Sequence, residues 1–335
     1  MDALMLWGNN FIVALQQAWP GLGGVMLAFS FLGNEEFFLL FMPALYWCWD
    51  AGLGLRLAVL LVSGNAVTAL GKLAFHLPRP YWVDSRVQAL SNEASYGLPS
   101  GHALVATSVW GGLAAYLKQP RAWLGAVTVI ALISLSRVYL GVHFPTDVVA
   151  GWLVGAALLW AFTRWGAALA ARLRVMRLWM LISLALAVSL IYLVLTSGLL
   201  LVNLITPDPA QWGTQAALAT NTPVGEAAIS PRAPETPVTI AGLMFGLGTS
   251  LALIAHTAQA RFNARRGTGL QRALRFGIGI VGVLVIWLGL RALFPVGGDV
   301  VALTLRFVRY ALTIVWALYA APIVFVRFKL AELDL

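Results

Sequence analysis

Residues 178–204 read LWMLISLALAVSLIYLVLTSGLLLVNL, a run without a charged side chain. A helix of about 20 consecutive apolar residues is long enough to cross the hydrocarbon core of a bilayer. Similar runs recur along the whole 335-residue chain, which is 60% hydrophobic and 10% charged, with a mean hydropathy of +0.84. Soluble domains carry about 25% charged residues. The sequence therefore predicts an all-α, multi-pass integral membrane protein.

The apolar runs predict nine membrane spans. They lie at 31–49, 54–74, 101–117, 121–140, 144–164, 176–204, 238–259, 273–294 and 299–326. We interpret them as a bundle with a six-helix core and a three-helix C-terminal extension. By residue range, the motif-bearing core is 31–165 and the extension, with one long loop, is 166–335.

The first thirty residues are predicted as a separate N-terminal segment. Gln16, Gln17 and Pro20 interrupt the apolar pattern of residues 1–30. We therefore expect an interfacial helix and a re-entrant turn here rather than a tenth span. The single cysteine, Cys48, lies in an apolar run, so it is expected to be a core residue and provides no metal cluster.

The net charge of +9 is explained by membrane topology better than by nucleic-acid binding, because no basic stripe interleaved with aromatic residues lies outside the spans. Most of the 22 lysines and arginines fall in loops on one side of the nine predicted spans, which the positive-inside rule makes cytoplasmic. These residues are Arg56, Lys118, Arg121, Arg164, Arg172, Arg174, Arg177, Arg261, Arg265, Arg266, Arg272, Arg275, Arg327 and Lys329. The opposite helix ends then face a periplasm, a lumen or the cell exterior.

The long loop at 205–237 lies on that non-cytoplasmic side. Its prolines prevent a single regular helix from running through it. The sequence leaves two interpretations open, a mobile tether and a lid over the site described next.

Three polar clusters lie at helix ends on the non-cytoplasmic side. They read KLAFHLPRP at 72–80, PSGH at 99–102 and SRVYLGVHFPTD at 136–147. Together they place three cations, the imidazoles of His102 and His143 and a carboxylate at one membrane depth. Phosphoryl transfer needs these residue types. The third histidine of the clusters, His76, lies between Lys72 and Arg79 and is expected to be a loop residue.

The cations Lys72, Arg79 and Arg137 can neutralise phosphate oxygens. Ser100 and Gly101, at a helix start, offer backbone N–H groups to the same anion.

The two imidazoles can divide the chemistry between them. One can attack phosphorus and the other can protonate the leaving oxygen. Asp147 lies four residues after His143, so its carboxylate can accept the second ring N–H and select the tautomer. The remaining imidazole is His102. No carboxylate or cysteine cluster suits a metal, so neither a metal nor a cofactor is expected.

The three clusters resemble the tripartite signature of the type 2 phosphatidic acid phosphatase superfamily, KxxxxxxRP, PSGH and SRxxxxxHxxxD. The resemblance covers roughly residues 31–165. It implies that His143 becomes phosphorylated, that His102 is the general acid and that Asp147 orients the nucleophile. It also implies a phosphate cradle, formed by Lys72, Arg79, Ser100, Gly101 and Arg137.

Two branches of this superfamily look most similar. The segment GNEEFFLLFMP at 33–43 is similar to sphingosine-1-phosphate phosphatases. The stretches RPYWV at 79–83 and YLGVHFPTDVVAG at 139–151 are similar to glucose-6-phosphatase.

Four further residues are candidates for a substrate cavity. Arg306 and Arg309 are three apart in the last predicted span and hence on one helix face, where an unpaired arginine is costly. They are expected either to line the cavity or to form a structural ion pair, with Glu35, Glu36 or Asp299. Trp82 would line the entrance or fit the aromatic belt, and Glu35 would touch substrate or lie solvated at the interface.

The sequence therefore predicts a phosphatase that hydrolyses a lipid phosphate at the membrane surface through a phosphohistidine. The expected partners are this substrate and membrane lipids, and no nucleic acid. A soluble sugar phosphate and undecaprenyl diphosphate are the alternative substrates. A transporter or scramblase with a vestigial site is the rival from another class, which phosphate release would exclude.

Overall fold

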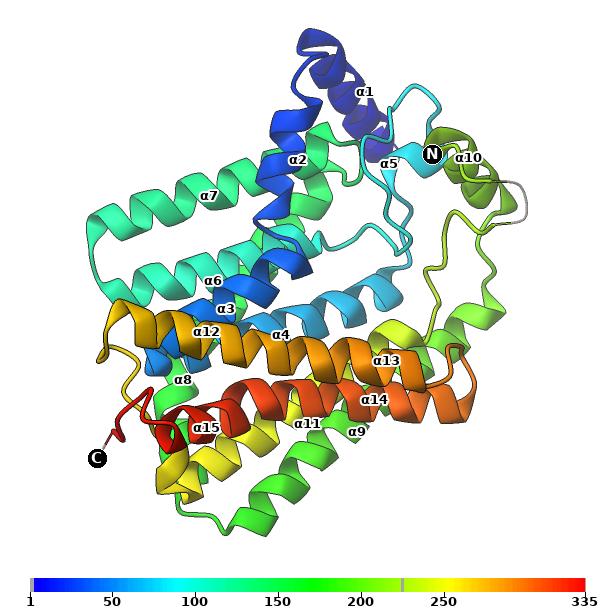
Figure 1. Cartoon of the computed structure of the whole chain (residues 1–335). Coiled ribbons are helices and arrows are strands. Elements are labelled where there is room, and N and C mark those ends of the chain that lie inside the picture. The colour runs from blue at the N-terminus through cyan, green and yellow to red at the C-terminus, as the bar shows by residue number, and fades with distance from the viewer. Residues whose placement is uncertain (1–2, 224–225, 335) are drawn as a thin grey trace. The chain divides into compact units, whose positions relative to one another are not determined.

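The computed structural model describes residues 3–223 and 226–334, and within them it is helical, with one isolated antiparallel bridge between Phe262 and Leu333 (Figure 1). Seven helical segments are long and apolar enough to cross a membrane. They are Ala51–Val83, Pro120–Tyr139, Pro145–Arg174, Leu178–Ile205, Glu235–His256, Gly269–Leu293 and Val300–Arg327. The prediction of a helical, multi-pass integral membrane protein is confirmed.

The other two predicted spans form shorter helices. The span expected at 31–49 is α3 (Glu35–Cys48), with 14 residues, and the span expected at 101–117 is α6 (Gly101–Leu117), with 17. Helix α3 starts late because residues 32–34 form a turn, and α6 ends at Leu117 because the next residue, Lys118, has a left-handed φ of 54°. At 1.5 Å per residue, α3 is about 21 Å long, less than the roughly 30 Å of a hydrocarbon core.

The N-terminal segment is a bent helix pair. Helices α1 (Ala3–Ala18) and α2 (Gly23–Phe31) meet at 117°, with the break at 19–22. The interruption expected around Pro20 is therefore present. Such a geometry fits a re-entrant turn or a broken span.

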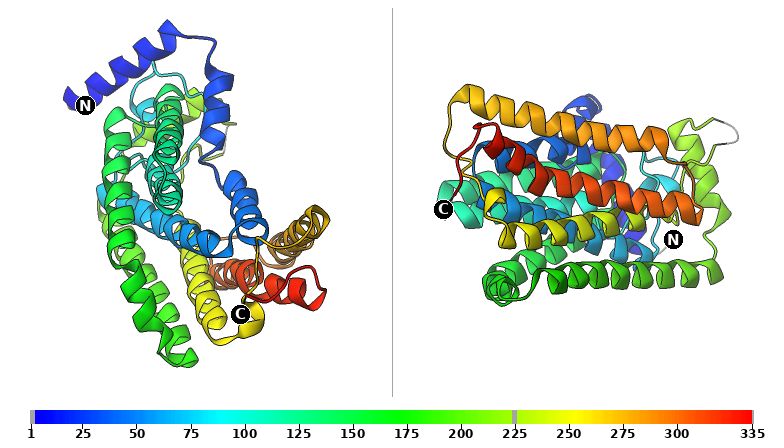
Figure 2. Two further views of the ribbon diagram at one scale, coloured as in Figure 1. Left: turned by 90° about the vertical axis from the view of Figure 1, so that its left-hand side faces the viewer. Right: turned by 60° about the horizontal axis from the view of Figure 1, so that its bottom comes forward.

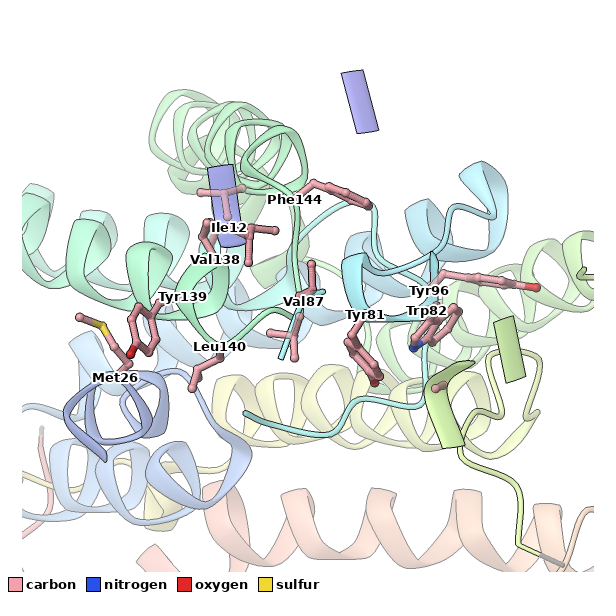
Figure 3. Packing of buried hydrophobic residues seen from close by; sticks show 14 of the residues in the cluster. Ile12, Met26, Tyr81, Trp82, Val87, Tyr96, Val138, Tyr139, Leu140 and Phe144 are labelled. Atoms are coloured by element: carbon pink, nitrogen blue, oxygen red, sulfur yellow. The ribbon is translucent and has the colours of Figure 1, made fainter. Parts of the chain in front are cut away.

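The described residues form two compact units, each built from separate parts of the chain. The first unit comprises Met1–Phe37, Val67–Trp160 and Thr196–Ala233. In it, α6 and α7 (Pro120–Tyr139) run side by side as an antiparallel hairpin (Figure 1). Its core brings Tyr81, Trp82 and Tyr96 together (Figure 3). The ring centroid of Trp82 lies 6.3 Å from that of Tyr81 and 6.4 Å from that of Tyr96.

The second unit comprises Phe38–Ala66, Ala161–Leu195 and Pro234–Leu335. In it, α11 (Glu235–His256) packs along α14 (Val300–Val315), and α12 (Gly269–Leu284) lies beside them (Figure 2). The Trp316 indole donates to the Gly279 carbonyl at 3.0 Å. A Cβ at Gly282 would fall 2.0 Å from the Trp316 ring, so only glycine allows this approach.

Helices α4 (Ala51–Phe75), α8 (Pro145–Arg174) and α9 (Leu178–Ile205) each contribute to both units. The extension ends in α13 (Leu290–Leu293), α14 and α15 (Ala321–Arg327), with π-helical turns at Val285–Gly289 and Trp316–Ala320. A short 3-10 helix follows α11 at Ala258–Ala260.

The long loop at 205–237 contains a helix that the sequence analysis did not place, α10 (Ala210–Thr220). It lies between Pro209 and Pro223, so the prolines bound it rather than interrupt it. Trp212 on α10 packs against Trp82 of α5 (Pro80–Val83), with the two ring centroids 6.1 Å apart. Residues 224 and 225 lie outside the described residues. The described part of the loop includes a packed helix, α10, and is therefore not only a tether.

A polar cluster fixes the loop on both sides of α10, through Asp208 before the helix and Arg232 after it. Asp208 accepts a hydrogen bond from Tyr96 at 3.0 Å and pairs with Arg232 at 3.0 Å. It also lies 2.6 Å from the His76 ring nitrogen. His76 follows the end of α4 with a φ of 54°, as expected for a loop residue, but the sequence did not indicate its partner.

Candidate active site

The three polar clusters of the sequence all lie in the first unit. Lys72 is in the last turn of α4, Arg79 immediately precedes α5, and Ser100 precedes α6. Arg137 is in the last turn of α7, and His143 lies in the turn between α7 and α8. The structure thus brings residues from four helix ends and one turn to one place.

Arg79 connects the clusters. Its side chain is completely buried, and Nη1 donates to the Val142 carbonyl at 2.8 Å and lies 3.3 Å from Nε2 of His143. Its Nε donates to the Ser95 carbonyl at 2.5 Å. Lys72 donates to the hydroxyl of the same Ser95 at 2.7 Å. The guanidinium is therefore held rigidly beside the imidazole.

A residue that the sequence analysis missed, Glu93, occupies the centre of this arrangement. It lies in the loop between α5 and α6, and its carboxylate forms ion pairs with Arg79, at 3.5 Å, and with Arg137. Both guanidinium groups are almost fully buried, whereas Glu93 is about a quarter exposed. Tyr81 fixes the Glu93 backbone through a bond to its carbonyl at 2.9 Å.

The electrostatics at Glu93 favour an anion. Burial alone would raise the pKa of the Glu93 carboxyl, but the charges of Arg79, Arg137 and Lys72 outweigh it and hold this pKa well below its usual range. The carboxylate is therefore ionised at neutral pH. It marks the position where two buried arginines bind two oxygens of an anion, which is the geometry that a phosphate group needs.

His143 is oriented by Asp147. The Nδ1 of His143 lies 3.2 Å from Oδ2 of Asp147, which also accepts the backbone N–H of Phe144 at 3.0 Å. A carboxylate only accepts, so Nδ1 carries the proton and Nε2 keeps its lone pair. That lone pair is on the side of the ring near Arg79. The i, i+4 spacing seen in the sequence therefore produces the expected pair.

The His143 imidazole is neutral at pH 7. Burial lowers its pKa well below the usual 6.5, and the positive charges of Arg79 and Arg137 lower it further. A neutral ring is what a nitrogen nucleophile requires.

His102 is positioned by another residue that the sequence analysis did not single out. Its Nε2 lies 2.9 Å from Oδ1 of Asn34, in the turn between α2 and α3. A Cβ at the preceding residue, Gly33, would fall 2.6 Å from the His102 ring. In the sequence, the one indication that Asn34 matters was its place in the GNEEFF segment, which is similar to sphingosine-1-phosphate phosphatases.

Several buried polar atoms at the site have no hydrogen-bond partner among the described residues. They include Oγ of Ser100 and Nε of Arg137. The backbone N–H of Ser100 donates to the Asp147 carbonyl at 3.0 Å, and Arg137 also donates to Ser30 at 2.6 Å. An unpaired buried polar group costs roughly 1–3 kcal/mol. The oxygens of a bound phosphate would satisfy such groups.

Comparison with known proteins agrees with this geometry. The family model of the PAP2 superfamily matches residues 53–171, which hold all three clusters. A second model, for the transmembrane extension of PAP2 superfamily phosphatases, matches residues 238–333. The chain carries a PAP2 superfamily domain and its transmembrane extension. The resemblance inferred from the motifs is confirmed.

The PAP2 domain is similar to proteins with different named substrates. An undecaprenyl-diphosphatase from Sulfolobus acidocaldarius is 33% identical over 106 residues, 31% of this chain and 50% of that protein. Mouse sphingosine-1-phosphate phosphatase 2 is 32% identical over 134 residues, 38% of each chain. Bovine glucose-6-phosphatase 3 is 33% identical over 192 residues, 49% of this chain and 54% of that protein. The chain thus spans about half or less of these relatives.

Among solved structures, a transmembrane PAP2-type phosphatidylglycerolphosphate phosphatase from Bacillus subtilis is 25% identical. It covers 48% of this chain and 86% of its own, with a TM-score of 0.39.

The remaining predicted residues lie outside the PAP2 cradle. Trp82 is completely buried in the aromatic core of the first unit, so it does not line an entrance, because Tyr81, Tyr96 and Trp212 surround its ring. Glu35 is exposed in the first turn of α3.

Arg306 and Arg309 belong to the second unit, where Arg306 donates to Thr239 at 2.8 Å. Asp299, one of the expected ion-pair partners, instead caps α14 and pairs with neither arginine within the described part of this unit. The pairs with Glu35 or Glu36, which belong to the first unit, stay a prediction.

Proposed function

We propose that this protein hydrolyses phosphate monoesters of membrane lipids through a phosphohistidine, without a metal. The observation that carries the proposal is the anion position between Arg79 and Arg137, next to the unprotonated Nε2 of His143. The PAP2 match supports phosphatase activity, and the membrane-embedded helices support a lipid substrate. A lipid tail can remain in the bilayer while the head group enters the site.

In the first step, the substrate phosphate displaces the Glu93 carboxylate and binds Arg79 and Arg137. Nε2 of His143 attacks phosphorus, a P–N bond forms, and the P–O bond to the alcohol breaks. The negative charge of the bound phosphate favours the protonated form of His102, which donates its proton to the leaving oxygen. Asp147 stabilises the positive imidazole ring that forms.

In the second step, water replaces the alcohol. His102, now neutral, removes a proton from the water, whose oxygen attacks phosphorus. The P–N bond breaks, His143 recovers its lone pair, and inorganic phosphate leaves. Protein cations take the role of charge neutralisation throughout.

The deciding experiment measures phosphate released by the purified full-length protein in detergent. The substrates are phosphatidic acid, sphingosine-1-phosphate, undecaprenyl diphosphate and glucose-6-phosphate. We expect the highest kcat/KM for a lipid monophosphate. A preference for glucose-6-phosphate would instead favour the soluble sugar phosphate that the bovine relative is named for. If none of the four substrates releases phosphate, the proposed phosphatase activity would be refuted, and a transporter or scramblase would be favoured.

We further propose that the active site faces away from the cytoplasm, because the loops rich in arginine and lysine lie at the opposite helix ends. Arg86 follows α5 and is half exposed, so it can report on the side. A Cys48→Ser, Arg86→Cys protein in sealed cells should react with a membrane-impermeant maleimide. Labelling only after permeabilisation would contradict this orientation.

Metal removal should have no effect on activity. The described residues contain no group of three or more His, Cys, Asp or Glu side chains that could hold a metal ion. We expect full activity in excess EDTA and inhibition by vanadate, which occupies the phosphate position. Activity that disappears with EDTA and returns with Mg²⁺ would contradict the proposal.

Replacing Glu93 should reveal its competition with substrate. We expect Glu93→Gln to lower KM and the inhibition constant of inorganic phosphate by about 10-fold, since one charge-assisted contact is worth about 1.5 kcal/mol. The variant should also unfold at a lower temperature, because two buried cations lose their counter-charge, and vanadate should reverse this loss.

The matched control for Glu93 is Asp84→Asn. Asp84 lies in the same loop but pairs with the exposed Arg86 at 2.7 Å, outside the cradle. We expect unchanged kinetic constants for this control. A raised KM in Glu93→Gln would show that Glu93 positions the arginines and does not compete for them.

The pH dependence should reflect the lowered pKa of His143. Because the neutral ring is the reactive form, and its pKa lies below 6.5, activity should persist as pH falls past 6.5 and decline only at lower pH. The measurement is kcat/KM against pH, corrected for the ionisation of the substrate phosphate. An acid limb at or above pH 6.5 would contradict the assigned protonation state.

A further inference from the structure

The second unit contains a pocket where α13 turns into α14. It has a volume of about 150 Å³ and is lined by Trp287, Arg291, Phe294, Arg306, Arg309 and Tyr310, with parts of the connecting turn. Three of its side chains are cationic, and none of its lining residues is acidic. The pocket lies in the extension and uses no residue of the PAP2 cradle.

Two of the arginines are held on one aromatic ring. The guanidinium carbons of Arg306 and Arg309 lie 5.7 Å and 5.0 Å from the centroid of Tyr310. Trp287 lies 3.4 Å from the Tyr310 hydroxyl, and Arg306 Nε donates to Thr239 on α11 at 2.8 Å. These contacts orient the planar groups before any ligand binds.

Arg309 has donors left over. Its side chain is only 7% exposed, and its Nε has no hydrogen-bond partner among the described residues. A guanidinium carries five N–H donors and no acceptor. Leaving such a group buried and unpaired in an apolar helix is costly unless an anion completes it.

Nearby carboxylates do not supply that anion. Asp299 accepts the backbone N–H groups of Val301 and Ala302, each at 3.0 Å. Glu235 lies near Gly298, and no ion pair joins it to the three arginines in the described part of the chain. The pocket therefore retains its positive charge.

We propose that this pocket binds a phosphate group, carried by a phospholipid headgroup or free in solution. Planar guanidinium groups bind phosphate oxygens in pairs. Val296 in the pocket lining is 87% exposed, and Leu293 and Val300, at the adjoining ends of α13 and α14, are 78% and 80% exposed. Exposed apolar residues beside a cationic pocket suit the glycerol and acyl chains that continue from a headgroup.

The test measures the unfolding temperature of the full-length protein in detergent. The probes are phosphatidylglycerol, diacylglycerol with the same chains, and inorganic phosphate. Phosphatidylglycerol is a diester and so is not a substrate of the proposed monoester hydrolysis. Since phosphate release is not the readout, failure of the proposed function would leave this result unchanged.

We expect phosphatidylglycerol to raise the unfolding temperature by about 5 °C at a hundred-fold excess over its Kd. Arg309→Met should lose this rise, whereas diacylglycerol should cause none. The matched control is Arg266→Met, because Arg266 is exposed, pairs with Glu332 and does not line the pocket. It should keep the full rise.

An equal, Arg309-dependent rise with inorganic phosphate alone would support the anion site and assign it to free phosphate. An equal rise with phosphatidylglycerol in wild type and Arg309→Met would overturn the proposal. If Arg309→Met does not fold, Arg306→Met takes its place, and native mass spectrometry counts the phosphatidylglycerol bound. Unchanged lipid binding in that variant would also overturn it.

Discussion

His143→Ala is expected to reduce kcat by at least about 10⁴-fold on every substrate that the wild type hydrolyses. In the proposed mechanism, Nε2 of His143 forms the bond to phosphorus. His102, the other imidazole of the motifs, is held by Asn34 and has the separate task of proton transfer. Alanine removes the nucleophile and leaves the arginines in place.

The measurement has two parts. Phosphate release gives the rate, and the rise in unfolding temperature with vanadate shows whether the cradle still binds an anion. We expect His143→Ala to release no phosphate but still to be stabilised by vanadate. The rise in unfolding temperature should be smaller than in the wild type, because vanadate cannot form the covalent bond to His143. Trapping of an acid-labile, base-stable phosphoprotein with wild type but not with His143→Ala would identify the intermediate.

Asp147→Asn is the matched variant, because it keeps the nucleophile and changes only the group 3.2 Å from Nδ1. An amide can donate to the ring and stabilise the wrong tautomer, so we expect a loss of about 10²–10⁴-fold. Substantial turnover of an ordinary alkyl phosphate by His143→Ala would refute the phosphohistidine mechanism.

His102→Ala should affect substrates according to their leaving groups. An alkoxide leaves only when it is protonated, so we expect kcat on a lipid phosphate to fall by about 10²–10⁴-fold. A nitrophenolate leaves without a proton, so the rate of bond cleavage in p-nitrophenyl phosphate should fall much less. The ratio of the two losses is the quantity to measure.

Burst kinetics separate the two steps for His102→Ala, since water attack on the phosphohistidine also needs a base. With p-nitrophenyl phosphate we expect a rapid burst of nitrophenol followed by slow turnover. Asn34→Ala should show a weaker form of the same pattern, because Asn34 holds His102 at 2.9 Å. Equal losses on both substrates, with no burst, would mean that His102 is not the general acid.

The sequence by itself determined the helical membrane fold and the three motifs. Hydropathy is a property of local composition, so seven of the predicted spans appear in the structure. The pair of His143 and Asp147 was also predictable, because His143 lies in the turn that leads into α8, only four residues before Asp147, so a local fold of the chain brings the two side chains together.

Only the tertiary structure decided which residues complete the site. Glu93 meets Arg137 across 44 residues, and Asn34 meets His102 across 68. These contacts depend on how helix ends pack and where loops fold back, and neither periodicity nor motif spacing encodes that. The same reason explains why Trp82, beside a motif, is core, and why Arg306 donates to Thr239, which is 67 residues away in the sequence.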